Sequence, residues 1–190
     1  YKNTVSIMGS ARFEESNQWY QEARALGKLL AHANIGVVTG GGPGIMEAGN
    51  RGAFESKGES VGITIHLPME QRTNPYLTRS QSFYYFFVRK VMLFYTAQAY
   101  VFFPGGFGTL DEFFELVTLV QTHKIDRNTV PLILVGREFW TPLLKYINDT
   151  VYEQYSAIDK DDMKLYHLVD TAQEAYDIII RYPPRKEVYY

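Results

Sequence analysis

The feature that most constrains this chain is a regular alternation of short apolar runs with longer amphipathic runs. Short runs rich in β-branched residues predict strands, and apolar residues spaced three and four apart in the longer runs predict helices. Such alternation predicts an α/β fold, with a parallel sheet and helices on both faces. The predicted strands are Thr4–Met8, Gly36–Thr39, Ser60–Ile65, Tyr100–Phe103, Val130–Val135 and Leu165–Val169. The predicted helices are Gln18–His32, Ile45–Ser56, Ser82–Thr96, Thr109–His123, Trp140–Glu153 and Ala172–Arg181.

Length and composition agree with one globular domain. The chain has 190 residues, of which 46% are hydrophobic and 21% charged. We expect a single domain over residues 1–182 and a C-terminal tail over residues 183–190. The formal net charge of −2 provides no broad basic field, which disfavours a nucleic-acid partner. No apolar run is long enough to cross a bilayer, so we expect a cytoplasmic protein without a membrane partner.

Glycine-bearing turns follow three of the first four predicted strands, in the sequences MGS, TGGGPG and FFPGGFGT. The carboxyl ends of parallel strands meet at one edge of a sheet, where ligands bind in folds of this class. Glycine lets the backbone approach a ligand closely, and the N-terminus of a following helix favours a phosphate. Both GGGPG and PGGFGT precede a predicted helix, so we expect a phosphate site at this edge. Tight turns without a ligand are the alternative for either loop alone.

Two common nucleotide motifs are absent. The chain has no GxxxxGK[ST] sequence, which disfavours a triphosphate site. In the position of the third glycine of a GxGxxG motif, after Gly106 and Gly108, the chain has Asp111. A dinucleotide site is therefore disfavoured as well.

Arg89 and Lys90 are the only charged residues between Arg79 and Asp111, and they lie in a predicted helix crowded with aromatic residues. A buried cation needs an anionic partner, and arginine, unlike lysine, does not lose its proton in proteins. We therefore favour a functional role for Arg89 over one for Lys90. The alternative is that both side chains extend past the aromatic rings to solvent.

Glu112 lies one turn beyond the predicted phosphate loop. Because Thr109 precedes it by three residues, the pair is also typical of a capping box, which would make Glu112 structural. Its position beside a phosphate loop favours a second interpretation. A carboxylate there would reach the ribose of a bound nucleotide, stabilise a cationic sugar or orient a water for attack at C1′.

Glu47 follows GGGPGIM much as Glu112 follows the other loop, so we treat it as a possible ligand contact. The four histidines are isolated, and no pair has metal-ligand spacing. Cysteine is absent, which excludes thiolate catalysis and cysteine-ligated metal centres. We expect neither a metal nor an organic cofactor.

The aromatic residues of the third predicted helix and its flanks also predict a subunit interface. One sheet face cannot cover all of them, so we expect a homodimer or a higher homo-oligomer. These residues are Phe83, Tyr84, Phe86, Phe87, Phe94 and Tyr95.

The combination of GGGPGIMEAGNRGA, VRK and PGGFGTLDE resembles the Lonely Guy (LOG) family of cytokinin-activating phosphoribohydrolases. The resemblance runs from about Val5 to the sixth predicted strand. It implies a Rossmann-like α/β domain, a dimer or an assembly of dimers, and hydrolysis of a nucleoside 5′-monophosphate. The substrate would be AMP or an N6-modified AMP, and the products the free base and ribose 5-phosphate.

The same resemblance implies roles for particular residues. Arg89 and Glu112 would form the catalytic pair. Gly105, Gly106, Gly108 and Thr109 would hold the phosphate. Further nucleotide contacts would come from Ser10, Gly42, Lys90 and Thr118. Plant members of the family lack the NPY-type loop at Asn74–Tyr76, part of the longer predicted loop His66–Ser80, and we expect the NPY-type loop to shape the base pocket.

Two other functions compete with this hypothesis. A non-enzymatic nucleotide or molybdenum-cofactor carrier protein would share the fold and the glycine loops, but would not need Arg89 together with Glu112. A protein that processes single-stranded DNA fits poorly with the acidic net charge. Nothing in the sequence argues for a pyridoxal phosphate lysine, so a lysine decarboxylase is not supported.

Overall fold

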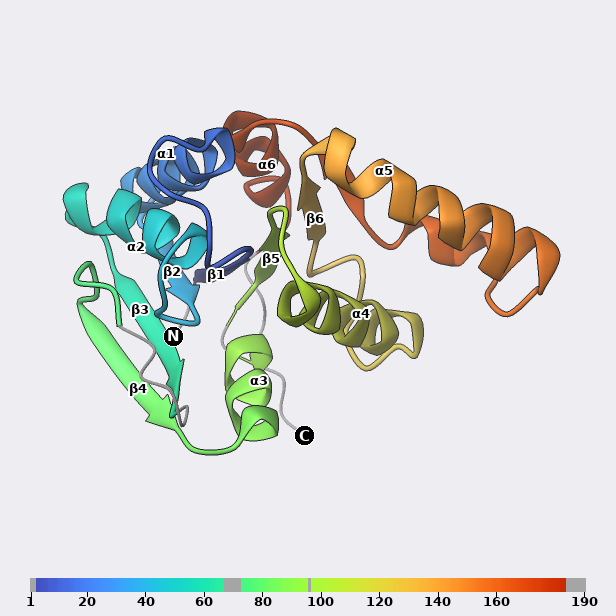
Figure 1. The fold of residues 1–190 in the computed structure, drawn as a ribbon, viewed down its shortest axis with the longest axis horizontal. Coiled ribbons are helices and arrows are strands. Elements are labelled where there is room, and N and C mark those ends of the chain that lie inside the picture. The colour runs from blue at the N-terminus through green and yellow to red at the C-terminus, as the bar shows by residue number, and fades with distance from the viewer. Residues whose placement is uncertain (1–2, 67–72, 96, 184–190) are drawn as a thin grey trace.

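The computed structural model describes residues 3–66, 73–95 and 97–183. At its centre is a seven-stranded sheet, parallel at every pairing, in the order β4-β3-β2-β1-β5-β6-β7 (Figure 1). This sheet confirms the predicted α/β fold. The strands are β1 (Thr4–Met8), β2 (Gly36–Thr39), β3 (Ser60–Ile65), β4 (Arg79–Phe83), β5 (Ala99–Phe102), β6 (Leu132–Val135) and β7 (His167–Val169).

Helices cover both faces of the sheet (Figure 1). One face packs against α1 (Gln18–His32), α2 (Ile45–Glu55) and α6 (Ala172–Ile179), and the other against α3 (Phe86–Tyr95) and α4 (Phe107–Gln121). Alternate residues of each strand supply the two cores, because successive side chains of a strand point to opposite faces. In β5, Val101 joins the α1 side, whereas Phe102 joins the α4 side.

The chain after β6 forms α5 (Arg137–Tyr146), which continues as a π-helical segment, Ile147–Gln154. A short 3₁₀ segment, Lys160–Lys164, then leads to β7. Figure 1 shows α5 and its continuation extending away from the sheet. Trp140 attaches the start of α5 to the core on the α4 side, and its indole nitrogen donates a hydrogen bond to the carbonyl of Val135.

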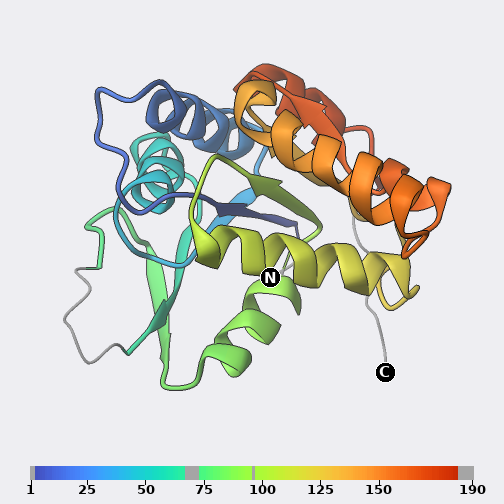
Figure 2. The ribbon, with the colours of Figure 1, turned by 45° about the vertical axis from the view of Figure 1, so that its right-hand side comes forward.

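Strand β4 corrects the prediction of a loop over His66–Ser80 and of a helix starting at Ser82. The segment Arg79–Phe83 pairs with β3 at the sheet edge and leads directly into α3, which begins only at Phe86 (Figure 2). Its sequence, RSQSF, is mostly polar, and its first four residues are exposed. Pairing with β3 and the packing of Phe83 against the core hold this edge strand, which therefore lacks the apolar pattern by which buried strands are predicted.

The strand order changes direction between β1 and β5. The chain builds the sheet outward from β1 through β2 and β3 to β4, then crosses to β5 on the other side of β1. The last residues of these two central strands, Met8 and Phe102, are partners in register. Ligands bind outside the carboxyl ends of the strands at such a switch point.

Candidate active site

A cavity of about 690 Å³ opens at this switch point, beyond the carboxyl ends of β1 and β5. The loops that follow β1, β2 and β5 form most of its wall, with contributions from the end of β3 and from α2, α3, α4 and α5. The described residues that line it are Gly9, Ser10, Ala11, Arg12, Phe13, Gly40, Met46, Ile65, Arg89, Gly105, Gly106, Phe107, Gly108, Thr109, Glu112 and Phe139.

The loop Gly105–Thr109 brings the N-terminus of α4 to the cavity. The first helical hydrogen bond joins the Leu110 nitrogen to the Gly106 carbonyl, so the preceding N–H groups have no acceptor within the helix. A Cβ atom added at Gly106 or Gly108 would meet nothing within 4 Å. The helix end is therefore open, and its N–H groups and dipole favour an anion such as phosphate.

Gly105 and Thr109 support this loop from behind. A Cβ atom at Gly105 would lie 2.2 Å from the Thr109 hydroxyl oxygen, so only glycine allows this packing. Thr109 is buried. Glycine thus serves the fold at Gly105 and leaves free space at Gly106 and Gly108.

The capping box, the structural alternative for Thr109 and Glu112, is not present. Helix α4 begins at Phe107 with Gly106 as its N-cap, and no described side chain caps it. Thr109 is the third residue of the helix instead of its cap, and Glu112 lies in the second turn. Because the helix starts two residues earlier than predicted, Glu112 has no capping role.

Glu112 forms a buried ion pair with Arg89. The Arg89 Nη2 atom lies 3.2 Å from Glu112 Oε1, and the side chains are 13% and 11% exposed, respectively. Burial raises the pKa of the Glu112 carboxyl to about 7, while the positive charge of Arg89 acts in the opposite direction. The site therefore holds a carboxyl group that changes charge near neutral pH, which is typical of functional groups.

Gly40, at the end of β2, makes room for the Arg89 side chain. A Cβ atom at Gly40 would lie 2.9 Å from Arg89 Nη1 and 2.8 Å from the Met46 sulfur. We did not predict Gly40 or Met46 as site residues. Their position in TGGGPGIM was the available signal, but the sequence does not tell which glycine of that run faces the cavity.

The rest of the GGGPG loop is held by the protein itself. The Asn74 amide donates to the Gly42 carbonyl at 3.0 Å, and the Asn74 backbone nitrogen donates to the Gly41 carbonyl at 2.9 Å. Asn74 is buried and also donates to Asn50, at 3.0 Å. Gly42, a predicted nucleotide contact, does not line the cavity. Asn74, which belongs to the predicted base-pocket loop Asn74–Tyr76, thus supports the glycine loop. Residues 67–72 of the longer predicted loop His66–Ser80 lie outside the described residues.

Ser10, a predicted nucleotide contact, lines the cavity and connects three loops. Its nitrogen donates to the Pro104 carbonyl at 3.0 Å, and its carbonyl accepts from the Ile45 nitrogen at 2.9 Å. Its hydroxyl oxygen accepts from the Arg12 nitrogen at 3.1 Å, which leaves the hydroxyl hydrogen available to a ligand.

The remaining predicted contacts do not line the cavity. Glu47 accepts a hydrogen bond from the Tyr20 hydroxyl at 2.9 Å. Lys90 joins α3 to α4 through ion pairs with Asp111, at 3.1 Å, and Glu115, at 2.5 Å. Thr118 is exposed, and its hydroxyl donates to the Phe114 carbonyl, as threonines inside helices commonly do.

Among the residues that the structure describes, no group of three or more histidine or carboxylate side chains is placed to hold a metal ion. The helices of the described chain are all too short or too polar to cross a membrane.

A family model described as "possible lysine decarboxylase" matches residues 46–179. A cytokinin riboside 5′-monophosphate phosphoribohydrolase from Rhodococcoides fascians is 26% identical over 155 residues, which cover 80% of this chain and 77% of the relative. The protein named cytokinin riboside 5′-monophosphate phosphoribohydrolase LOG, from Oryza sativa subsp. japonica, is 29% identical over 192 residues, with coverages of 99% and 76%.

Solved structures share the fold. The molybdenum cofactor binding protein from Rippkaea orientalis superposes with a TM-score of 0.69 at 18% identity, covering 95% of this chain and 97% of that protein. At that identity the likeness concerns the fold alone. The family match spans most of the chain, and the names of the relatives agree with the family that the sequence motifs resemble. The chain therefore belongs to the LOG family, whose family model is described as "possible lysine decarboxylase".

Proposed function

We propose that the cavity binds a nucleoside 5′-monophosphate, AMP or an N6-modified AMP, and that the protein hydrolyses its N-glycosidic bond. The observation that carries this proposal is the buried Arg89–Glu112 pair, one turn beyond the open N-terminus of α4. The names of the relatives support the same reaction.

The 5′-phosphate of the substrate binds at the N-terminus of α4. The N–H groups of Phe107, Gly108 and Thr109 bind its oxygens, and the helix dipole adds a partial positive charge. Binding there, away from the bond that breaks, uses the energy of the phosphate contact to orient the ribose. The C1′ atom is thereby brought to the Arg89–Glu112 pair.

Glu112 then acts on the sugar. As the bond between C1′ and the base nitrogen breaks, positive charge develops on the ribose, and the ionised carboxylate stabilises it. A water molecule adds its oxygen to C1′, its proton passes to Glu112 or to solvent, and the base leaves with the electron pair of the broken bond and takes up a proton. Arg89 favours the ionised form of Glu112 and holds its orientation.

Two competing activities explain this site less well. A carrier that only binds an anion gains nothing from a buried carboxylate beside it, because like charges repel. A pyridoxal phosphate decarboxylase requires a lysine at the reacting centre, and none of the described residues that line the cavity is a lysine.

A product assay tests the proposal. The purified protein is incubated with a panel of nucleoside 5′-monophosphates, and free base and ribose 5-phosphate are measured by chromatography. We expect release of both from AMP or an N6-modified AMP, and none from adenosine, which lacks the phosphate. Equal rates on AMP and adenosine, or no release from the whole panel, would contradict the proposal.

We also propose that the reaction needs no metal, since acids, bases and electrostatics suffice for glycoside hydrolysis. Activity should persist after dialysis against EDTA. A complete loss that a divalent cation restores would show that a metal takes part.

We further propose a homo-oligomer, formed through the outer side of α3 and its N-terminal flank. Phe94 is buried in the chain's own core and Phe83 packs against it, while the Phe86 side chain lies outside the described part. The aromatic residues left exposed for a partner subunit are Tyr84, Tyr85, Phe87 and Tyr95. Light scattering at micromolar concentration should give at least a dimer, and a monomer would refute this.

A further inference from the structure

Arg12 lines the candidate active site on a loop that is fixed beside the phosphate loop. The Phe103 nitrogen donates to the Met8 carbonyl at 2.9 Å, and the Ser10 nitrogen donates to the Pro104 carbonyl at 3.0 Å. The loops after β1 and β5 therefore leave the sheet side by side. The bond from the Arg12 nitrogen to the Ser10 hydroxyl then sets the backbone of Arg12 against the same cavity that Gly106 and Gly108 line.

Arg12 differs from Arg89, the other positively charged residue of the cavity wall, in its ion-pair partners. The charged residues among the described lining are Arg12, Arg89 and Glu112. Arg89 and Glu112 neutralise each other as an ion pair. Arg12 is exposed, and no described carboxylate forms an ion pair with it.

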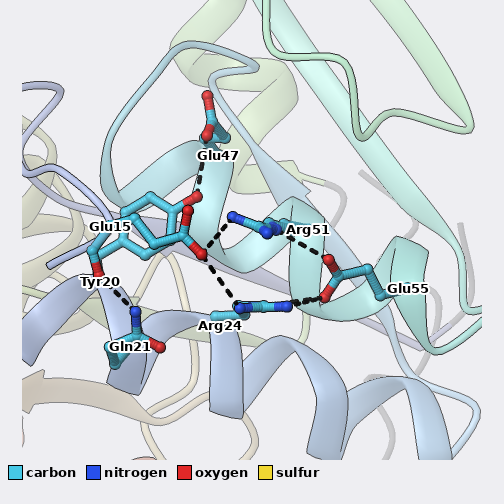
Figure 3. A network of polar contacts seen from close by, with 7 residues as sticks. All are labelled: Glu15, Tyr20, Gln21, Arg24, Glu47, Arg51 and Glu55. Atoms are coloured by element: carbon cyan, nitrogen blue, oxygen red, sulfur yellow. Dashed lines mark hydrogen bonds and ion pairs between the residues drawn. The ribbon is translucent and has the colours of Figure 1, made fainter.

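Glu15, an acidic residue three positions from Arg12, is held by other partners. Its carboxylate lies 2.8 Å from Arg51 and 3.5 Å from Arg24. Figure 3 shows Glu15 between these two arginines, which in turn bind Glu55. This network joins α1 to α2 and occupies the carboxylate of Glu15, which therefore forms no ion pair with Arg12.

A phosphate monoester carries a charge of about −1.5 to −2 at pH 7, whereas a helix N-terminus supplies roughly +0.5. The Gly106–Thr109 loop alone therefore leaves most of that charge uncompensated. A guanidinium group compensates it well, because its planar set of donors binds two phosphate oxygens at once.

We infer that Arg12 binds the 5′-phosphate together with the N-terminus of α4, and so sets the selectivity for phosphorylated over unphosphorylated nucleosides. This inference rests on the proposed function. The N-terminus of α4 orients the phosphate, and the attraction that Arg12 adds is the same in the bound substrate and in the transition state. Arg12 therefore acts mainly on KM, while Glu112 acts on kcat.

The test compares Arg12→Ala and Arg12→Lys with Arg79→Ala. Arg79 begins β4 at the opposite end of the sheet, and its side chain is 68% exposed, so this control removes the same charge outside the cavity. We expect KM for AMP to rise about 10- to 100-fold in Arg12→Ala, the usual effect of losing a charged hydrogen bond, and less in Arg12→Lys. In both, kcat should change by less than about threefold.

Binding is measured separately by calorimetry with ribose 5-phosphate and inorganic phosphate, which do not depend on turnover. Affinity should fall in Arg12→Ala and not in Arg79→Ala. If AMP is hydrolysed but KM and affinity stay normal in Arg12→Ala, or the loss is confined to kcat, the role of Arg12 is wrong and the proposed function stands. If no nucleotide is hydrolysed but phosphate binding still depends on Arg12, the role of Arg12 stands and the proposed function is wrong. A wild-type protein that binds no phosphate would overturn both.

Discussion

The chain builds the same arrangement twice, a strand followed by a glycine loop and a helix with a glutamate near its start, and puts the two copies to different uses. Gly41 and Gly44, before α2, have φ angles of +72° and +69°, and a Cβ atom at Gly44 would lie 2.3 Å from the Ser10 carbonyl oxygen. Gly106 and Gly108, before α4, have no such contacts. Gly41 and Gly44 of the first loop serve the packing of the protein, whereas Gly106 and Gly108 of the second leave open space in the cavity wall.

The two glutamates differ in the same way. Glu47 binds the Tyr20 hydroxyl and does not line the cavity, whereas Glu112 is buried in the cavity wall against Arg89. Similar position in the sequence therefore does not imply similar chemistry. The partner of each side chain decides its chemistry. That partner lies 27 residues from Glu47 and 23 residues from Glu112.

The largest effect that we expect is on the free energy of unfolding, from a substitution in the first loop. Gly44→Ala places a methyl group against the Ser10 carbonyl at a φ angle that alanine disfavours. Overpacking and strain of this kind should lower the free energy of unfolding by about 3 kcal/mol or more. Urea denaturation measures it. An unfolding midpoint equal to that of the wild type would mean that the first loop is no more constrained than the second.

The next effect concerns pH. If the ionised form of Glu112 is the active one, kcat/KM should fall about tenfold per pH unit below its pKa of about 7, and be level above it. The substrate phosphate also ionises, near pH 6. The residual activity of Glu112→Gln provides the control, because it should retain only that second ionisation. A profile that falls as pH rises through 7 would instead indicate that the protonated acid is active.

The same pKa shift predicts how stability depends on pH. The folded protein favours the neutral form of Glu112, whereas the unfolded carboxyl ionises above its ordinary pKa, about 4.3. This contribution to stability is therefore complete below pH 4.3 and is lost as pH rises through about 7. Glu112→Gln should weaken that dependence in urea titrations at pH 4, 6 and 8. An unchanged dependence would show that the carboxyl is not perturbed.

A smaller effect is expected in the second loop. Gly108 is the second residue of α4, so Gly108→Ala should leave the fold intact and stabilise the helix by up to about 1 kcal/mol. Its methyl group would occupy the space left for the phosphate, and KM for AMP should rise about tenfold or more, equivalent to about 1.4 kcal/mol. Thermal unfolding and steady-state kinetics measure the two quantities. A normal KM would remove Gly108 from the phosphate site.

Much of this molecule could be predicted from its sequence. The buried strands and the helices between them have strong apolar periodicity, and the loop PGGFGT with Arg89 and Glu112 indicated the site. Three features could not be predicted because they depend on more than the local sequence pattern. Strand β4 depends on pairing with β3, the start of α4 lies within a glycine-rich sequence, and Gly42 faces Asn74, which is distant in sequence. Arg12 follows the first glycine turn directly, but only the structure shows its place in the cavity wall.

The measurement that tests the central claim most directly compares Glu112→Gln with Glu47→Gln. Both changes remove one charge near the start of a helix that follows a glycine loop, and both keep a hydrogen-bonding side chain of similar size. If Glu112 stabilises the sugar cation, its variant should lose about 10²- to 10⁴-fold in kcat while AMP binding stays close to wild type and the thermal midpoint does not fall. Glu47→Gln should change kcat by no more than a few-fold. Near-normal turnover in Glu112→Gln, or equal losses in the two variants, would contradict the mechanism.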